Sequence, residues 1–260
     1  LDYVFIFILK WGMFGAALAT SLGYIVGAVM ILAYLFHPER ILHVCRVKLS
    51  KKSLYLTIRN VGYMCRLGFS SFLCETAIAT MMFVGNYVFI RYLGEDGVAA
   101  YSIACYFFPI VFMVYNAIAQ SAQPILSYNY GAKCTARVRE TFRLALTTAI
   151  LCGAGVFLLT WIFSHQIVGM FLDSSYPAYN IAVKGLPLFA SGFVFFGINI
   201  VSIGYFQSLE RDCLAMIITL LRGFVLILLC FWILPIIWGS WGIWLAVPMS
   251  ELLTFLFVLV

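Results

Sequence analysis

The chain has 260 residues, of which 64% are hydrophobic and 10% are charged, with a net charge of +6. Soluble globular domains are about 45–50% apolar, so this composition excludes a soluble fold. Long uncharged apolar runs, each near the roughly 20 residues that cross a bilayer, predict an all-α polytopic membrane protein.

Seven membrane spans are expected along the chain. They cover residues 13–36, 68–91, 98–124, 144–163, 183–208, 213–235 and 241–260. Residues 1–9 are interpreted as the end of an earlier helix. Because residue 1 falls inside an apolar run and is not an initiator methionine, we expect the chain to be part of a longer protein.

The basic residues predict how the protein lies in the membrane. Segment 37–66 holds seven of the 16 basic residues, segment 128–143 holds four, and Arg211 brings the number on one side to 12. This side is expected to be cytoplasmic, because cytoplasmic loops are enriched in Lys and Arg. The positive charge thus predicts an orientation in the bilayer and no nucleic-acid partner.

Two segments of the chain resemble each other. WGMFGAALA at 11–19 and WGSWGIWLA at 238–246 agree at five of nine positions, although Gly and Ala are common enough in membrane helices for a coincidence. A true repeat would have a period of 227 residues and six helices, which keeps the two repeats parallel in the membrane. A whole protein of about 450 residues and twelve helices would follow.

This period predicts three parts in the chain. Residues 1–36 are the end of an N-terminal lobe, 37–66 form a basic cytoplasmic segment between the lobes, and 67–260 form a six-helix C-terminal lobe. The expected fold is therefore the last helix of one lobe followed by the whole of the second. The rest of the first lobe, which this sequence does not include, is an expected partner of the second.

Ionisable residues inside the spans are the sharpest indication of function. Each costs about 2.5–3.5 kcal/mol on insertion scales, so it normally faces a cavity or a partner. Glu75 has no basic residue at i±3 or i±4, so it is a candidate proton carrier or cation ligand; a carboxyl that hydrogen-bonds to a neighbouring helix is the alternative. Arg222 and Glu251 lie in neighbouring spans, and a structural ion pair is expected for Arg222. Glu251 is also a cleft candidate, because Pro248 can free carbonyls near it.

Uncharged polar side chains supply the other candidates for a substrate cleft. Asn116 and Gln120 share one helix face with Gln123, at spacings i, i+4 and i+7. Such a stripe is either interhelical hydrogen bonding or a path for substrate. Tyr106 belongs to an aromatic-rich span that could pack against lipid or contact organic cations. The remaining candidates are Asn86, Asn199 and Gln207.

One short stretch, QPILSYNYGAK at 123–133, is densely polar at the end of a long apolar run. Pro124 cannot continue an ideal helix, and Gly131 permits a left-handed stop. Lys133 lies favourably at the negative end of the helix dipole. We expect a non-ideal helix end that could act as a hinge.

The motif also carries a family resemblance. AQSAQPILSYNYGAK closely resembles the AQG.QPI.SYNYGA pattern of the multidrug and toxic compound extrusion (MATE) family. Further similar pieces follow in the family's order: WGMFGAALAT, GFSSFLCE, YFQSLERD, LLRG and WGIWLAVPMSELLT. Ala117 and Ser121 depart from the usual glycines of the pattern.

This resemblance implies a function and the residues that carry it. It implies a two-lobe, twelve-helix antiporter that exports organic, often cationic, drugs in exchange for H⁺ or Na⁺ by alternating access. The implied coupling carboxylate is Glu75, and the signature residues are Gln123, Pro124, Asn129 and Gly131. No cofactor or resident metal is expected, only the transported ion. The implied setting is the bacterial inner membrane, with a monomer expected for the full-length protein.

Two rival functions stay open from the sequence. A lipid-linked oligosaccharide flippase of the same superfamily would need a cationic cleft, whereas Arg222 alone lies inside a span. A non-transporting membrane scaffold would have little use for a lone carboxylate at the depth of Glu75. An enzyme is not expected, because the spans hold no HExxH or GxSxG motif.

Overall fold

The computed structural model describes residues 3–36 and 50–259, without the side chains of residues 7, 51, 52, 66, 67 and 70. The chain divides into two compact units, Leu1–Asn60 and Val61–Val260. Much of the predicted inter-lobe segment 37–66 lies outside the described residues, including Arg40, Arg46 and Lys48. The predicted boundaries of the three parts therefore stay a prediction.

The first unit contains a short π-helix, η1 (Val4–Ile8), and the long helix α1 (Gly12–Leu35). A tight turn joins them, and Gly12 has a left-handed φ of 53° in it. The rings of Phe5 and Trp11 stack across the turn, with their centroids 5.6 Å apart. Helix α1 occupies the range expected for the first span.

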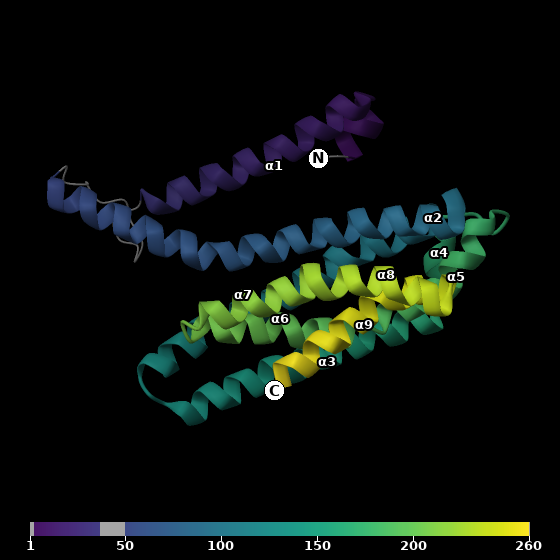
Figure 1. Ribbon diagram of the computed structural model, residues 1–260. Coiled ribbons are helices and arrows are strands. Elements are labelled where there is room, and N and C mark those ends of the chain that lie inside the picture. Colours follow the sequence, from purple (N-terminus) through teal and green to yellow (C-terminus); the bar gives the residue numbers. More distant parts are fainter. Residues whose placement is uncertain (1–2, 37–49, 260) are drawn as a thin grey trace. The chain divides into compact units, whose positions relative to one another are not determined.

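The second unit begins within helix α2 (Lys51–Gly131), which is broken at Gly94. Gly94 has φ 66° and ψ −156°, a conformation that residues with a β-carbon rarely adopt. The chain reverses there and brings the two halves together. The rings of Phe89 and Tyr101 stack with their centroids 4.3 Å apart, and the Tyr101 hydroxyl donates to the Met81 carbonyl. We call the two halves the first arm (51–93) and the second arm (95–131) of α2 (Figure 1).

The regular elements in the described rest of the second unit are all helices. Its elements are α3 (Thr135–Ile162), α4 (Ser164–Gly169), α5 (Pro177–Ala190), α6 (Phe193–Ser208), α7 (Asp212–Leu220), η2 (Leu221–Leu226), α8 (Ile227–Trp238) and α9 (Ser240–Leu259). Helices α8 and α9 pack against each other after a turn at Gly239, whose φ is 57° (Figure 1). Helices α5 and α6 meet at a bend of 41° inside the predicted span 183–208.

The described helices account for all seven predicted spans. Four stretches are long and apolar enough to cross a membrane, and the bent pair α5–α6 adds a fifth. Two of the four stretches, Ser71–Gly131 and Asp212–Leu259, contain the reversals at Gly94 and Gly239 and hold two predicted spans each. The expectation of an all-α membrane protein is confirmed.

Aromatic rings fill the interior of the second unit. Tyr101, Phe108 and Tyr115 of the second arm are at most 2% exposed. The sequence allowed these aromatic rings either to contact lipid or to line a substrate path. Both alternatives are wrong for these three rings, because they are buried in the protein interior. They fit because glycines face them: a β-carbon at Gly85 would clash with Tyr101, and one at Gly197 would lie 2.7 Å from the ring of Tyr115.

A polar cleft as the candidate functional site

Two adjoining cavities, of about 650 and 170 Å³, lie between the two arms of α2 and helix α6. They share Ser71, Asn116, Gln120, Gln123 and Gln207, so we treat them as one polar cleft. Its other lining residues are Gly68, Cys74, Glu75, Phe112, Ala119, Pro124, Ser127, Ile200, Ile203, Gly204 and Ser208.

Glu75 lies on the wall of the smaller cavity and is exposed. Of the lining residues that the structure describes, it is the one charged residue. Within the described part of the chain, neither a hydrogen bond nor an ion pair holds its carboxylate. The carboxylate can therefore bind a proton or a small cation without first breaking a protein contact.

The polar stripe of the second arm faces Glu75 across this space. Asn116, Gln120 and Gln123 all line both cavities, as their shared helix face predicts. Gln207 of α6 joins them, and its Oε1 accepts a hydrogen bond of 3.2 Å from Nε2 of Gln123. The cleft thus presents amide and hydroxyl groups around a single acid.

Sequence reasoning missed the serines of the cleft. Ser71 lies one helical turn before Glu75, and Ser127 lies one turn after Gln123. Extending the i, i+4 pattern would have found both. Ser208 of α6 had no such signal in the sequence.

The polar stretch 123–133 ties the end of α2 to the end of α6. The Ser127 hydroxyl donates to the Ser208 carbonyl at 3.2 Å. The Asn129 side-chain amide donates to the Ile125 carbonyl at 2.8 Å, which strengthens the last turn of the helix. The expected interruption at Pro124 is wrong, because α2 continues through it to Gly131.

The helix also ends differently from the expectation. Lys133, with φ 58°, takes the left-handed conformation that was expected of Gly131. The Cys134 amide then donates to the Asn129 carbonyl at 2.9 Å and closes the helix end. Gly131 remains helical and lines the next cavity.

A third cavity, of about 920 Å³, continues from the polar cleft toward the side that carries most of the basic residues. It shares Ser127, Gln207 and Ser208 with the cleft, and Lys133 and Arg139 also line it. A continuous series of cavities therefore connects Glu75 to the predicted cytoplasmic side.

Glu251 and Asn199 lie apart from the cleft, in a buried polar cluster. The Arg222 Nε atom lies 2.7 Å from Glu251 Oε1, and these side chains are 4% and 5% exposed. Asn199 is fully buried and its Nδ2 donates to Glu251 Oε2 at 2.8 Å. The Arg222 guanidinium also lies over the Phe196 ring, 4.5 Å from its centroid.

This arrangement bears on three of the expectations from sequence. The ion pair expected of Arg222 is present, with Glu251 as its partner. Glu251 and Asn199 do not line the cleft, because Arg222 and Asn199 both donate hydrogen bonds to the Glu251 carboxylate. Pro248 lies inside a continuous α9, so it does not open the helix beside Glu251.

Two further cleft candidates also lie elsewhere. Tyr106 is 66% exposed and stacks on Phe171 at 6.1 Å, at a different part of the second arm. Asn86 is half-buried on the first arm and does not line the cleft. Of the seven cleft candidates, Asn116, Gln120 and Gln207 are thus brought together with Glu75.

Apolar spanning helices around a polar cleft define a membrane-integral helical protein, one class of which transports solutes. The model of the MatE family matches residues 71–232, so the chain belongs to the MatE family. The match contains the first arm from Ser71, the second arm, and helices α3 to α6, and hence almost the whole polar cleft.

Individual proteins agree with this assignment. The chain is 21% identical over 227 residues to the multidrug export protein MepA of Staphylococcus saprophyticus, covering 87% of this chain and 49% of MepA. It is 26% identical over 243 residues to the probable multidrug resistance protein NorM of Rhizobium meliloti, covering 90% of this chain and 50% of NorM. The chain thus spans about half the length of these curated relatives.

The fold also matches a solved structure, the outward-facing conformation of a multidrug resistance MATE family transporter. The TM-score is 0.86 at 21% identity, over 99% of this chain and 57% of that one. The expectation of a MATE-type all-helical fold is confirmed, and this chain corresponds to about half of that structure.

Proposed function

We propose that this chain is the C-terminal part of a secondary antiporter that exports organic, often cationic, drugs in exchange for H⁺ or Na⁺. The single observation that carries the proposal is Glu75, a lone and unpaired acid in a polar cleft between membrane helices. The names of the relatives, which include multidrug export and multidrug resistance proteins, support the same function.

The coupling step follows from the chemistry of Glu75. An empty carboxylate carries a negative charge that attracts a cationic drug, and a bound H⁺ or Na⁺ removes that charge. Drug and coupling ion would therefore compete for one site, as exchange requires. Each would favour a different orientation of the two lobes, so that binding shifts the population between inward-open and outward-open states.

The composition of the cleft supports a cationic substrate. Among the described residues, the lining side chains are amides, hydroxyls and small or apolar groups, with one acid and no base. Arg222, the basic residue that a pyrophosphate-binding flippase would need, is instead buried against Glu251. This arrangement favours drug export over lipid-linked oligosaccharide transport.

The connected cavities support an entry route from the cytoplasm. The wider cavity beside Lys133 opens toward the predicted cytoplasmic side and joins the cleft at Gln207. In a bacterium, a drug would enter the cleft from the cytoplasm and then be exported across the inner membrane.

Ethidium efflux from cells that express the full-length protein tests the proposal. Glu75→Gln keeps the size of the side chain and removes its charge, so we expect efflux to fall to the background of cells without the protein. Glu95→Gln is the matched control, because Glu95 is an exposed acid outside the cleft, and it should export at the wild-type rate. Wild-type efflux from Glu75→Gln at equal expression would remove the role assigned to Glu75.

A further inference from the structure

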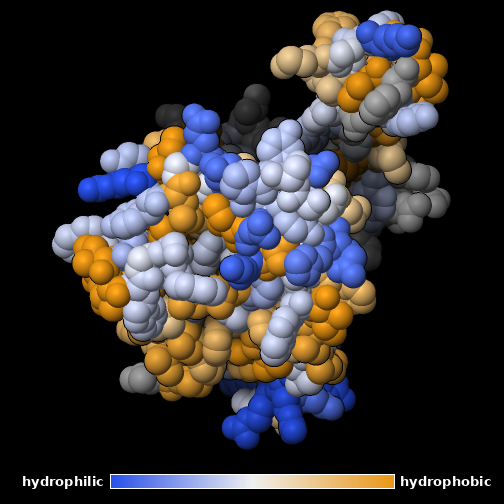
Figure 2. All heavy atoms as spheres, turned by 90° about the vertical axis from the view of Figure 1, so that its right-hand side faces the viewer, coloured by the Kyte–Doolittle hydropathy of each residue, from blue (hydrophilic) through white to orange (hydrophobic). Residues whose placement is uncertain are grey.

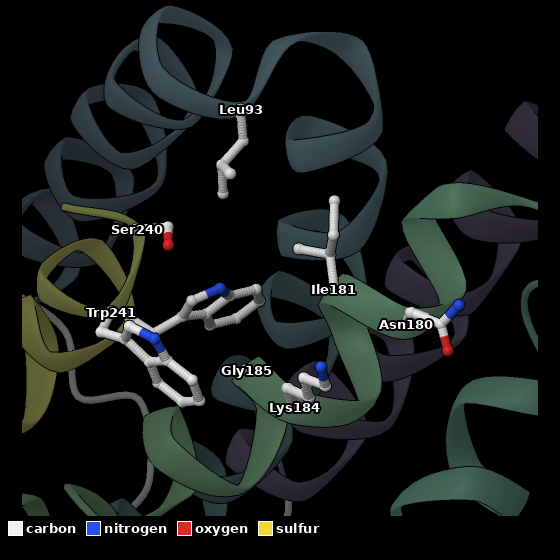
Figure 3. A pocket seen from close by; sticks show the side chains of 8 residues that line it. Leu93, Asn180, Ile181, Lys184, Gly185, Ser240 and Trp241 are labelled. Atoms are coloured by element: carbon white, nitrogen blue, oxygen red, sulfur yellow. The ribbon is translucent and has the colours of Figure 1, made fainter.

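A separate cavity of about 270 Å³ lies at the end of the second unit where α2 turns at Gly94 and α8 turns into α9. We call it the turn-end pocket. It is lined by Leu93, Asn180, Ile181, Lys184, Gly185, Ser240, Trp241 and Trp244 (Figure 3). It shares no residue with the polar cleft, so the proposed drug export does not use it.

The pocket has a cationic part and an apolar part. Lys184 of α5 supplies an exposed ammonium group, and no carboxylate belongs to the lining. Within the described ranges, Lys184 has no ion-pair partner. Its long apolar stem allows the ammonium to reach polar surroundings from a helix that lies in the membrane.

The apolar part is built from tryptophans of α9 and from aliphatic side chains. Trp244 is 4% exposed and its indole lies directly on Gly185, which has no side chain to obstruct it. Trp241 is 54% exposed, and Figure 3 shows it on the α9 side of the pocket, across from Ile181 and Lys184 of α5. Leu93 closes the space from the end of the first arm.

The position of the pocket matches the border between lipid and water. Its residues come from helix ends: Leu93 precedes the Gly94 turn, and Ser240 and Trp241 follow the Gly239 turn. Figure 2 views this end of the helices and shows hydrophilic and hydrophobic side chains side by side on it. Tryptophan is enriched at this depth of a bilayer, where acyl chains meet headgroups, and a lysine near a helix end can extend its ammonium to the same depth.

We propose that the turn-end pocket binds a membrane phospholipid, with the phosphodiester on Lys184 and an acyl chain along Leu93, Ile181 and Trp241. The unpaired ammonium provides the charge that complements a phosphate, and the Ser240 hydroxyl can donate a hydrogen bond to it. The volume of about 270 Å³ is below the roughly 300–1,000 Å³ of drug-sized pockets, so it suits a headgroup rather than a whole drug.

Native mass spectrometry of the purified full-length protein tests this proposal with phosphatidylglycerol as the probe. The wild-type protein should retain the lipid through detergent removal. Lys184→Gln should lower the retained fraction about fivefold, the effect expected of one basic residue near a phosphate-bearing surface. Trp241→Ala should lower it as well, because the acyl chain loses its contact.

Three controls decide between a lipid site and simpler explanations. Arg91→Gln removes a cation near the same helix turn but outside the pocket, and it should retain the lipid as the wild type does. Diacylglycerol, which lacks the phosphate, should not be retained, and inorganic phosphate should not displace phosphatidylglycerol. Four results would each overturn the proposal. They are retention of phosphatidylglycerol by Lys184→Gln at the wild-type level, the same loss of lipid in Arg91→Gln as in Lys184→Gln, retention of diacylglycerol, and displacement of phosphatidylglycerol by inorganic phosphate. Ethidium efflux of Lys184→Gln is a separate readout, so failure here would leave the proposed export function untouched.

Discussion

The buried pair of Arg222 and Glu251 yields a quantitative prediction about stability. The two charged atoms lie 2.7 Å apart, and both side chains are at most 5% exposed. Because both charges are delocalised, we take about 4 Å between their centres, at which two unit charges attract by about 4 kcal/mol at an effective dielectric of 20. This agrees with the 3–5 kcal/mol that removal of one partner from a buried pair typically costs.

We therefore expect Arg222→Met and Glu251→Gln each to lower the free energy of unfolding by about 3–5 kcal/mol. The double variant should cost less than either single one, because no uncompensated charge remains. Its glutamine can also still accept the hydrogen bond that Asn199 donates to Glu251. The coupling energy from this double-mutant cycle should therefore be at least about 3 kcal/mol.

The assay is reversible unfolding of the purified protein by SDS in mixed detergent micelles. Arg91→Met is the control for loss of an exposed cation and should change the free energy of unfolding by less than about 0.5 kcal/mol. Single variants that lose less than about 1 kcal/mol, or a double variant whose loss equals the sum of the singles, would refute this account of the pair.

Two further predictions concern packing inside the second unit. Gly185→Ala should lower the free energy of unfolding by about 1–3 kcal/mol, because its β-carbon would lie inside the Trp244 indole. Gly155→Ala should be neutral or stabilising, because nothing lies within 4 Å of that position. Thermal unfolding in detergent compares the two variants. Tyr115→Phe should cost about 0.5–1.5 kcal/mol, because it removes the 2.8 Å hydrogen bond to the first carbonyl of α6, and Tyr106→Phe at an exposed ring should leave the unfolding temperature unchanged.

The sequence predicted best what a single helix determines. The positions of Asn116, Gln120 and Gln123 on one face follow from helical geometry alone, and all three line the cleft. The first turn of α9 likewise repeats a feature of α1, because Gly12 and Gly239 both follow a tryptophan and both have a positive φ. Local backbone chemistry is therefore readable from short segments.

Contacts between distant helices were not predictable in the same way. Gln123 and Gln207 are 84 residues apart, and only the packing of α2 on α6 brings them together. Asn199 was placed in the cleft because it is polar, but its position on α6 directs it to Glu251. A polar residue inside a span can serve either a cleft or a buried cluster, and its sequence neighbours do not distinguish the two.

The end of α2 shows how tertiary contacts override local preference. Pro124 favours an early stop, yet the helix continues through it and ends at Gly131. The hydrogen bonds from Ser127 to α6 and from Asn129 to Ile125 stabilise this last stretch. The chain leaves the helix after Gly131, and Lys133 takes the left-handed conformation in the turn that follows.

The central claim, that Glu75 exchanges its bound ion for drug, is tested most directly in proteoliposomes that contain the full-length protein. A pH gradient and a Na⁺ gradient are imposed separately, and ethidium transport is followed by fluorescence. We predict that one gradient drives transport by the wild type and by Glu95→Gln, and that neither gradient drives transport by Glu75→Gln. Transport by Glu75→Gln at the wild-type rate under the same driving gradient would contradict the account.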